Sequence, residues 1–120
     1  MDDVFSIGNL EHSEGIITAA LAINTDSLIF KGHFPRQPVV PGACMLDAVR
    51  AVLEQALGRP IKLNKATQLK FVGILVPIKA AAALLEITYK TAEIEIIANG
   101  KLTGGDRVCM KFQASYSTIA

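Results

Sequence analysis

The spacing of apolar residues predicts one long helix in this chain. Between residues 43 and 57 they recur every three or four positions, which places them on one helical face. Gly58 and Pro60 follow directly and are typical of a helix end. No other stretch of the sequence combines this period with such end signals, so we expect a single central helix.

The other apolar stretches favour β-strands. Residues 16–23 are almost continuously apolar and rich in β-branched side chains, which predicts a strand buried on both faces. Residues 28–30 are expected to be extended, and Asn99-Gly100 is a strong hairpin signal. A polar turn is expected at residues 11–15. Further strands are predicted at residues 4–10, 64–72, 80–89, 92–98 and 107–117.

These elements predict an α+β fold in one domain, residues 1–120. A twisted antiparallel sheet must cover its apolar face, and one helix of about four turns is available to do so. The economical arrangement is a sheet wrapped around that helix, which is the hot-dog fold. Its exposed sheet edge predicts a homodimer, or a higher homo-oligomer built from dimers.

Composition supports an extra buried surface and excludes some partners. Hydrophobic residues make up 51% of the chain and charged residues 19%, which is apolar for an ordinary domain. The formal net charge of +1 gives no overall field that would attract nucleic acid. Residues 71–85 are strongly apolar, but Pro77 and Lys79 interrupt a run that is too short to span a bilayer. We therefore expect no nucleic-acid partner and no membrane span.

The N-terminal residues and the cysteines predict a cytoplasmic protein without a metal centre. The acidic start of the chain lacks the basic and apolar regions of a signal peptide. Cys44 and Cys109 do not have the paired spacing of a zinc site, and we expect both thiols to be reduced and buried. Neither a metal nor an organic cofactor is predicted.

The densest motif lies between residues 30 and 48, immediately before and within the predicted helix. It reads Phe-Lys-Gly-His-Phe-Pro over residues 30–35, Pro-Val-Val-Pro-Gly over residues 38–42, and Leu-Asp-Ala over residues 46–48. The prolines fix φ and push the preceding residues toward extended geometry, so this track should be stiff and non-helical until Gly42. The expected helix cap carries no Ser, Thr, Asp or Asn, which leaves the first helical N–H groups open to a ligand oxygen.

This motif resembles that of the 3-hydroxyacyl-[acyl-carrier-protein] dehydratases of the FabZ and FabA type, which are hot-dog dimers. The resemblance implies a hydro-lyase that converts 3-hydroxyacyl thioesters, carried on acyl carrier protein or coenzyme A, to trans-2-enoyl thioesters. Such chemistry belongs to fatty-acid biosynthesis or to related lipid and polyene pathways. Arg36 stands where the family commonly has glycine, and Pro77-Ile78-Lys79 replaces a Pro-Gly-Asp turn. These departures favour a divergent, short member of the family.

The resemblance also implies residue roles. His33 matches the family's catalytic histidine and Asp47 its catalytic carboxylate, donated by the helix of the other subunit. Gly42 matches the glycine whose N–H polarises the thioester carbonyl. Dehydration needs a base for the C2 proton, help for the departing hydroxyl and a donor to the enolate-like oxygen, which these groups supply. The residues expected to line the substrate site are Phe34, Pro41, Ala43 and Cys44.

Other interpretations of the same residues stay open. His33 could be a loop histidine bonded to backbone, and Asp47 could form an ordinary surface ion pair with Arg50 three residues along the helix. A hot-dog thioesterase could use Asp47 with a water molecule, although the histidine would then have no role. The chain could also be a non-catalytic module that binds acyl groups or a carrier protein.

Overall fold

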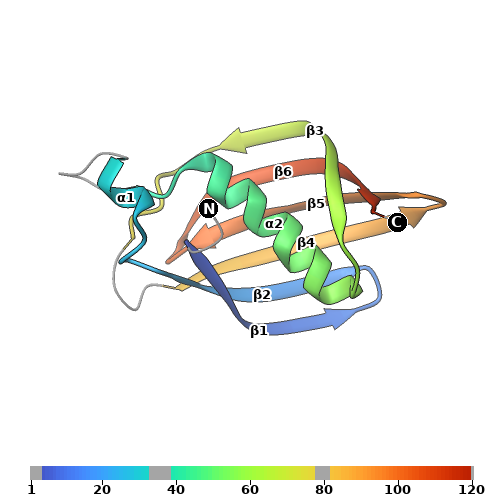
Figure 1. The fold of residues 1–120 in the computed structure, drawn as a ribbon, viewed down its shortest axis with the longest axis horizontal. Coiled ribbons are helices and arrows are strands. Elements are labelled where there is room, and N and C mark those ends of the chain that lie inside the picture. Colours follow the sequence, from blue (N-terminus) through green and yellow to red (C-terminus); the bar gives the residue numbers. More distant parts are fainter. Residues whose placement is uncertain (1–3, 33–38, 78–81, 120) are drawn as a thin grey trace.

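The computed structural model describes residues 4–32, 39–77 and 82–119, and these form one antiparallel sheet and two helices (Figure 1). The six strands lie in the order β1-β2-β4-β5-β6-β3, and each neighbouring pair is antiparallel. The elements in chain order are β1 (Phe5–Ser13), β2 (Ile16–Ile23), α1 (Ile29–Gly32), α2 (Gly42–Leu57), β3 (Ile61–Phe71), β4 (Ala82–Ala92), β5 (Glu95–Gly104) and β6 (Arg107–Thr118).

The long helix α2 crosses one face of this sheet obliquely to the strands, as Figure 1 shows. It lies near β1 and β3, which are the two edges of the sheet, so the sheet curls around the helix. This arrangement confirms the predicted α+β hot-dog fold. None of the helices in the described part of the chain is long and apolar enough to span a bilayer.

The helix predicted over residues 43–57 is confirmed and begins one residue earlier, at Gly42. One face of α2 packs against the inward residues of the sheet, because apolar side chains recur at helical spacing. The buried residues of the helix are Cys44, Met45, Ala48, Val49, Val52 and Leu53. Both cysteines are buried, as predicted.

The first hairpin confirms strand β2 at residues 16–23 but corrects its environment. Burial alternates along β2, with Ile17 and Leu21 in the core and Ile16 exposed, so only one face of the strand is covered. The prediction of burial on both faces was wrong because small alanines and isolated isoleucines are tolerated on a solvent-facing surface. The turn is also tighter than expected: β1 continues to Ser13, and Gly15 has a positive φ of 73°.

The hairpin predicted at Asn99-Gly100 was wrong. Both residues lie inside β5, opposite Thr88 and Ile87 of β4, and the actual turn follows Ala92. A Cβ atom at Gly100 would lie 1.9 Å from the backbone oxygen of Glu86, which no side chain could accommodate. Glycine is therefore required by the close approach of two strands, not by a turn.

The segment before the motif also differs from its prediction. Residues 29–32 form the short helix α1, whereas residues 28–30 were expected to be extended. Ser27 explains the difference: its backbone oxygen accepts the N–H of Phe30, and its hydroxyl accepts the N–H of Ile29 at 3.4 Å. Serine favours such local bonds at a helix start.

Strand β3 forms an edge of the sheet and pairs only with β6 among the described strands. Ile61 is buried, but every later residue of β3 is exposed. Large apolar side chains are among the exposed ones, on the strand and just beyond it: Leu63, Leu69, Phe71, Val72 and Ile74. This edge therefore presents both unpaired backbone groups and apolar surface.

Candidate active site

The N-terminal end of α2 has open backbone donors. Pro41 is the N-cap, with φ −62° and ψ 145°, and it makes no side-chain cap hydrogen bond. Its carbonyl accepts the N–H groups of Cys44 and Met45 at 3.0 and 3.2 Å. In the described part of the chain, the N–H groups of Gly42 and Ala43 have no hydrogen-bond acceptor. The helix start can thus donate to a carbonyl or anionic oxygen.

A neighbouring side chain leaves no room for a Cβ atom at residue 42, which accounts for glycine there. A Cβ atom built on it would lie 2.6 Å from Cζ of Phe71, the last residue of β3. The aromatic ring therefore covers the first turn of α2 at a distance that a side chain at residue 42 would prevent. Gly42 is not among the residues with a positive φ, so the helix start itself does not require glycine.

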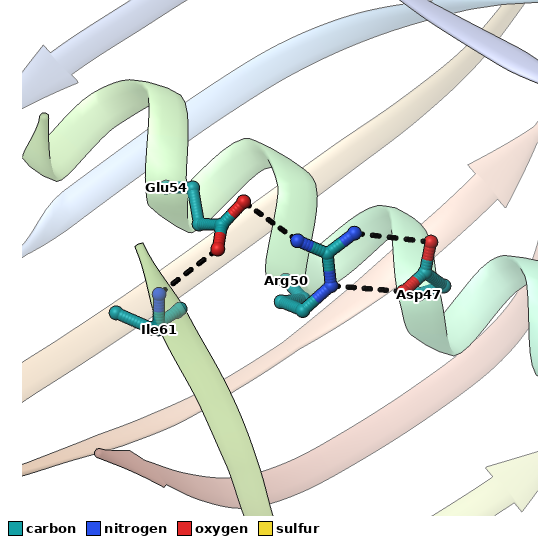
Figure 2. Close-up of polar contacts among 4 residues, drawn as sticks. All are labelled: Asp47, Arg50, Glu54 and Ile61. Carbon is teal, nitrogen blue, oxygen red and sulfur yellow. Dashed lines mark hydrogen bonds and ion pairs between the residues drawn. The ribbon is translucent and has the colours of Figure 1, made fainter. Parts of the chain in front are cut away.

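Asp47, in the second turn of α2, forms a two-point ion pair with Arg50 (Figure 2). Arg50 Nε lies 2.9 Å from Asp47 Oδ1, and Nη2 lies 3.3 Å from Oδ2. Arg50 Nη1 also donates to Glu54 Oε1 at 2.6 Å, and Glu54 Oε2 accepts the N–H of Ile61 at 2.9 Å. Arg50 is thus held between two carboxylates, and its pKa is raised, chiefly by the hydrogen bond to Asp47.

This ion pair is the one considered from the sequence. The side chains of Arg50 and Asp47 are 33% and 31% exposed, so solvent screens their attraction and its contribution to stability is small. Its main consequence is geometric, because the two-point contact fixes the plane of the Asp47 carboxylate.

A pocket of about 200 Å³ lies beside Asp47, between α2 and strands β3 and β6. Its wall is largely apolar, with the ion pair on one side. The lining residues are Ala43, Leu46, Asp47, Arg50, Leu63 and Tyr116. Two of the residues predicted from the sequence, Ala43 and Asp47, therefore share one pocket.

Tyr116 is the lining residue that the sequence did not single out. It faces α2 from β6, opposite Leu63 on β3, and is 1% exposed. Its hydroxyl is buried without a hydrogen-bond partner among the described residues. Burial raises the pKa of Tyr116 to about 12, while the charge of Arg50 lowers this pKa and that of Asp47 raises it. Apolar and polar residues alternate over much of residues 107–117, with Tyr116 among the apolar set, and this alternation was the available signal.

The other predicted site residues are distributed as follows. His33 and Phe34 lie outside the described residues, so their roles stay predictions. Pro41 is the N-cap of α2, and Cys44 is buried in the core and does not line the pocket. Within the described part, no group of three or more His, Cys, Asp or Glu residues is placed to hold a metal ion.

Solved structures place this architecture in the hot-dog class. The dehydratase heterocomplex ApeI:P from Xenorhabdus doucetiae is 19% identical with a TM-score of 0.75, covering 94% of this chain and 97% of that one. The E. coli PaaI protein from the phenylacetic acid degradation operon is 7% identical with a TM-score of 0.69, covering 99% and 82%. A hypothetical thioesterase with coenzyme A from Streptococcus pneumoniae is 9% identical with a TM-score of 0.68, covering 97% and 86%.

These structural matches show the fold alone, and a comparison with family models shows the family. Residues 9–104 match the ApeI-like family model, described as ApeI dehydratase, and this range includes the whole motif of residues 30–48. The chain belongs to the ApeI-like dehydratase family. The resemblance to hot-dog dehydratases is thereby confirmed, and the family is ApeI-like rather than specifically of the FabZ or FabA type.

Proposed function

We propose that this protein dehydrates 3-hydroxyacyl thioesters, carried on acyl carrier protein or coenzyme A, to trans-2-enoyl thioesters. The observation that carries the proposal is the ApeI-like dehydratase match over residues 9–104, in a chain where Asp47 borders a pocket at the open end of α2. The reaction would serve fatty-acid, lipid or polyene biosynthesis in the cytoplasm.

The geometry favours a particular division of labour. The Asp47 carboxylate is held by Arg50 as a hydrogen-bond acceptor, which suits it to orient the departing hydroxyl and not to protonate it. His33 then takes the C2 proton and delivers it to the C3 hydroxyl, which leaves as water while the C2–C3 double bond forms. The N–H groups of Gly42 and Ala43 donate to the thioester oxygen, where negative charge develops.

The site is proposed to be shared between subunits. Strand β3 pairs only with β6 among the described strands, and its free edge and exposed Leu69 and Phe71 support association of two copies through this strand. His33 of one copy would then act with Asp47 of the other. The Xenorhabdus doucetiae relative is a dehydratase heterocomplex, so a related but non-identical subunit is the competing partner.

Hydrolysis of acyl thioesters is the second candidate function. It is favoured by the likeness to the Streptococcus pneumoniae thioesterase with coenzyme A, which shares the fold. In that reaction Asp47 would orient an attacking water, and His33 would have no assigned role.

Turnover of 3-hydroxyacyl thioesters by wild-type protein and by His33→Ala tests the proposal. We expect wild-type protein to release the enoyl product and His33→Ala to lose at least about 100-fold in kcat, because the general base is removed. Unchanged turnover in His33→Ala would overturn the assignment. Binding of acyl thioesters by an inactive wild-type protein would instead identify a non-catalytic module.

Mixing two inactive variants tests the shared site. In a random mixture of His33→Ala and Asp47→Asn subunits, half of the dimers contain one of each, and each such dimer has one intact site. We therefore expect about a quarter of wild-type activity to return, given a two-fold symmetric interface. No recovery after verified subunit exchange would show that both residues act within one subunit.

A further inference from the structure

We infer that the Tyr116 hydroxyl is a substrate-binding group that donates a hydrogen bond to the 3-hydroxyl oxygen of the acyl chain, opposite Asp47. This inference rests on the proposed function and adds a residue that selects for the hydroxylated substrate. It assigns to the pocket between α2, β3 and β6 a donor on one side and an acceptor on the other.

The position of Tyr116 places its hydroxyl beside the proposed reaction. The side chain rises from β6 toward α2 and lines the same pocket as Asp47 and Arg50. Both charges act on its phenol, since Arg50 lowers its pKa and Asp47 raises it. The rest of the pocket wall is contributed by aliphatic side chains, which suit an acyl chain.

Burying the Tyr116 hydroxyl without a hydrogen-bond partner is unfavourable in free energy unless a ligand binds it. It is the only buried side-chain N or O atom, among the described residues, that lacks a hydrogen-bond partner. A phenylalanine would fill the same space without leaving a polar atom unsatisfied, so packing alone does not account for tyrosine. An unsatisfied donor beside a pocket is accounted for if a ligand supplies its partner.

The two polar groups are complementary to an alcohol. An ion-paired carboxylate such as Asp47 only accepts hydrogen bonds, whereas a phenol can donate one. With a pKa of about 12, Tyr116 keeps its proton at physiological pH. A 3-hydroxyl group can therefore donate to Asp47 and accept from Tyr116 at the same time. The enoyl product has no such oxygen and loses both bonds.

The hydroxyl shares its pocket with the Arg50 side chain, and we expect a rotamer change of Arg50 to give a ligand access to it. That side chain is 33% exposed, so it has room to move. The movement does not disturb the buried face of α2, because Arg50 lies outside the hydrophobic core.

The test compares two ligands that differ by one hydroxyl group. In an inactive His33→Ala background, calorimetry measures the affinity for a 3-hydroxyacyl-coenzyme A and for the saturated acyl-coenzyme A of equal length. We expect Tyr116→Phe to weaken binding of the hydroxylated ligand about tenfold and to leave binding of the saturated one unchanged. Its melting temperature should equal or exceed that of the parent, because an unsatisfied hydroxyl is removed.

The matched control is Tyr89→Phe, which removes the other tyrosine hydroxyl of the chain. That hydroxyl lies 2.6 Å from Nε2 of His12 on the exposed hairpin and should not affect either ligand. Equal weakening of both ligands by Tyr116→Phe, no weakening, or a lower melting temperature would overturn the inference. Absence of wild-type turnover would refute the dehydratase proposal alone, because the binding comparison does not depend on catalysis.

Discussion

The two ends of α2 differ in how their terminal backbone groups are hydrogen-bonded. At the C-terminal end, Gly58 adopts a left-handed conformation with φ 72°, and its N–H donates to the backbone carbonyl oxygen of Glu54 at 2.8 Å. The Glu54 side chain also accepts the N–H of Ile61, which starts β3. At the N-terminal end, Pro41 provides no side-chain cap, and the described residues offer no acceptor to the first two N–H groups.

This difference separates stability from function within one helix. A capping side chain at the N-terminus would contribute about 1 kcal/mol, and the chain forgoes it. In return, the helix start keeps donors next to the pocket that Asp47 borders. The closed C-terminal end instead fixes the helix to β3, so we expect substitutions at the two ends to affect different properties.

The largest effect is expected at the open end, from Asp47→Asn. The amide has one hydrogen-bond acceptor oxygen where the carboxylate has two. We therefore expect kcat for 3-hydroxyacyl thioesters to fall at least about 100-fold. The free energy of unfolding should change by less than about 1 kcal/mol, because the pair with Arg50 is partly exposed. Steady-state kinetics and urea denaturation measure the two quantities.

Glu54→Gln is the matched control, because it neutralises the other carboxylate that contacts Arg50. The amide oxygen of the variant can still accept the Ile61 N–H. Residue 54 lies about one helical turn beyond Arg50 and does not line the pocket. We expect it to keep kcat within about twofold, the size of a weak screened charge effect. Equal losses in both variants would mean that helix charge, and not the Asp47 position, controls activity.

A smaller effect, on stability alone, is expected at the closed end from Gly58→Ala. An alanine at φ 72° is strained, so the variant should lose about 1 kcal/mol of unfolding free energy in urea. No atom lies within 4 Å of a Cβ built there, so packing should not add to the loss. Catalytic constants should match the wild type; a large fall in kcat with normal stability would contradict the separation of the two ends.

Local patterns in the sequence predicted the long elements well. The apolar spacing of α2 and its Gly58 stop are properties of consecutive residues, and both are confirmed. The strand at residues 107–117 is confirmed as β6 for the same reason, because its inward residues alternate with polar ones. The sheet around one helix followed from these elements and from the need to cover an apolar face.

Features set by distant residues could not be predicted in this way. Gly100 resembles a turn glycine in sequence, but its identity depends on the Glu86 backbone oxygen of a neighbouring strand. The glycine at residue 42 likewise depends on Phe71, at the far end of β3. Strand pairing creates both contacts, so no local rule reveals them.

The candidate site shows the same division. Asp47 and its partner Arg50 are three residues apart on one helix, so their contact could be anticipated from helical spacing. Tyr116 reaches the same pocket from a strand near the other end of the chain, and only the folded structure shows that its hydroxyl lacks a partner.

The most direct test of the central claim follows both products of one thioester in one reaction. Wild-type protein is given a 3-hydroxyacyl thioester, and the enoyl thioester and the free thiol are measured together. Dehydration predicts that the enoyl product accumulates without thiol, and that the saturated acyl thioester does not react. Release of thiol from either substrate without enoyl product would contradict the account and identify a thioesterase.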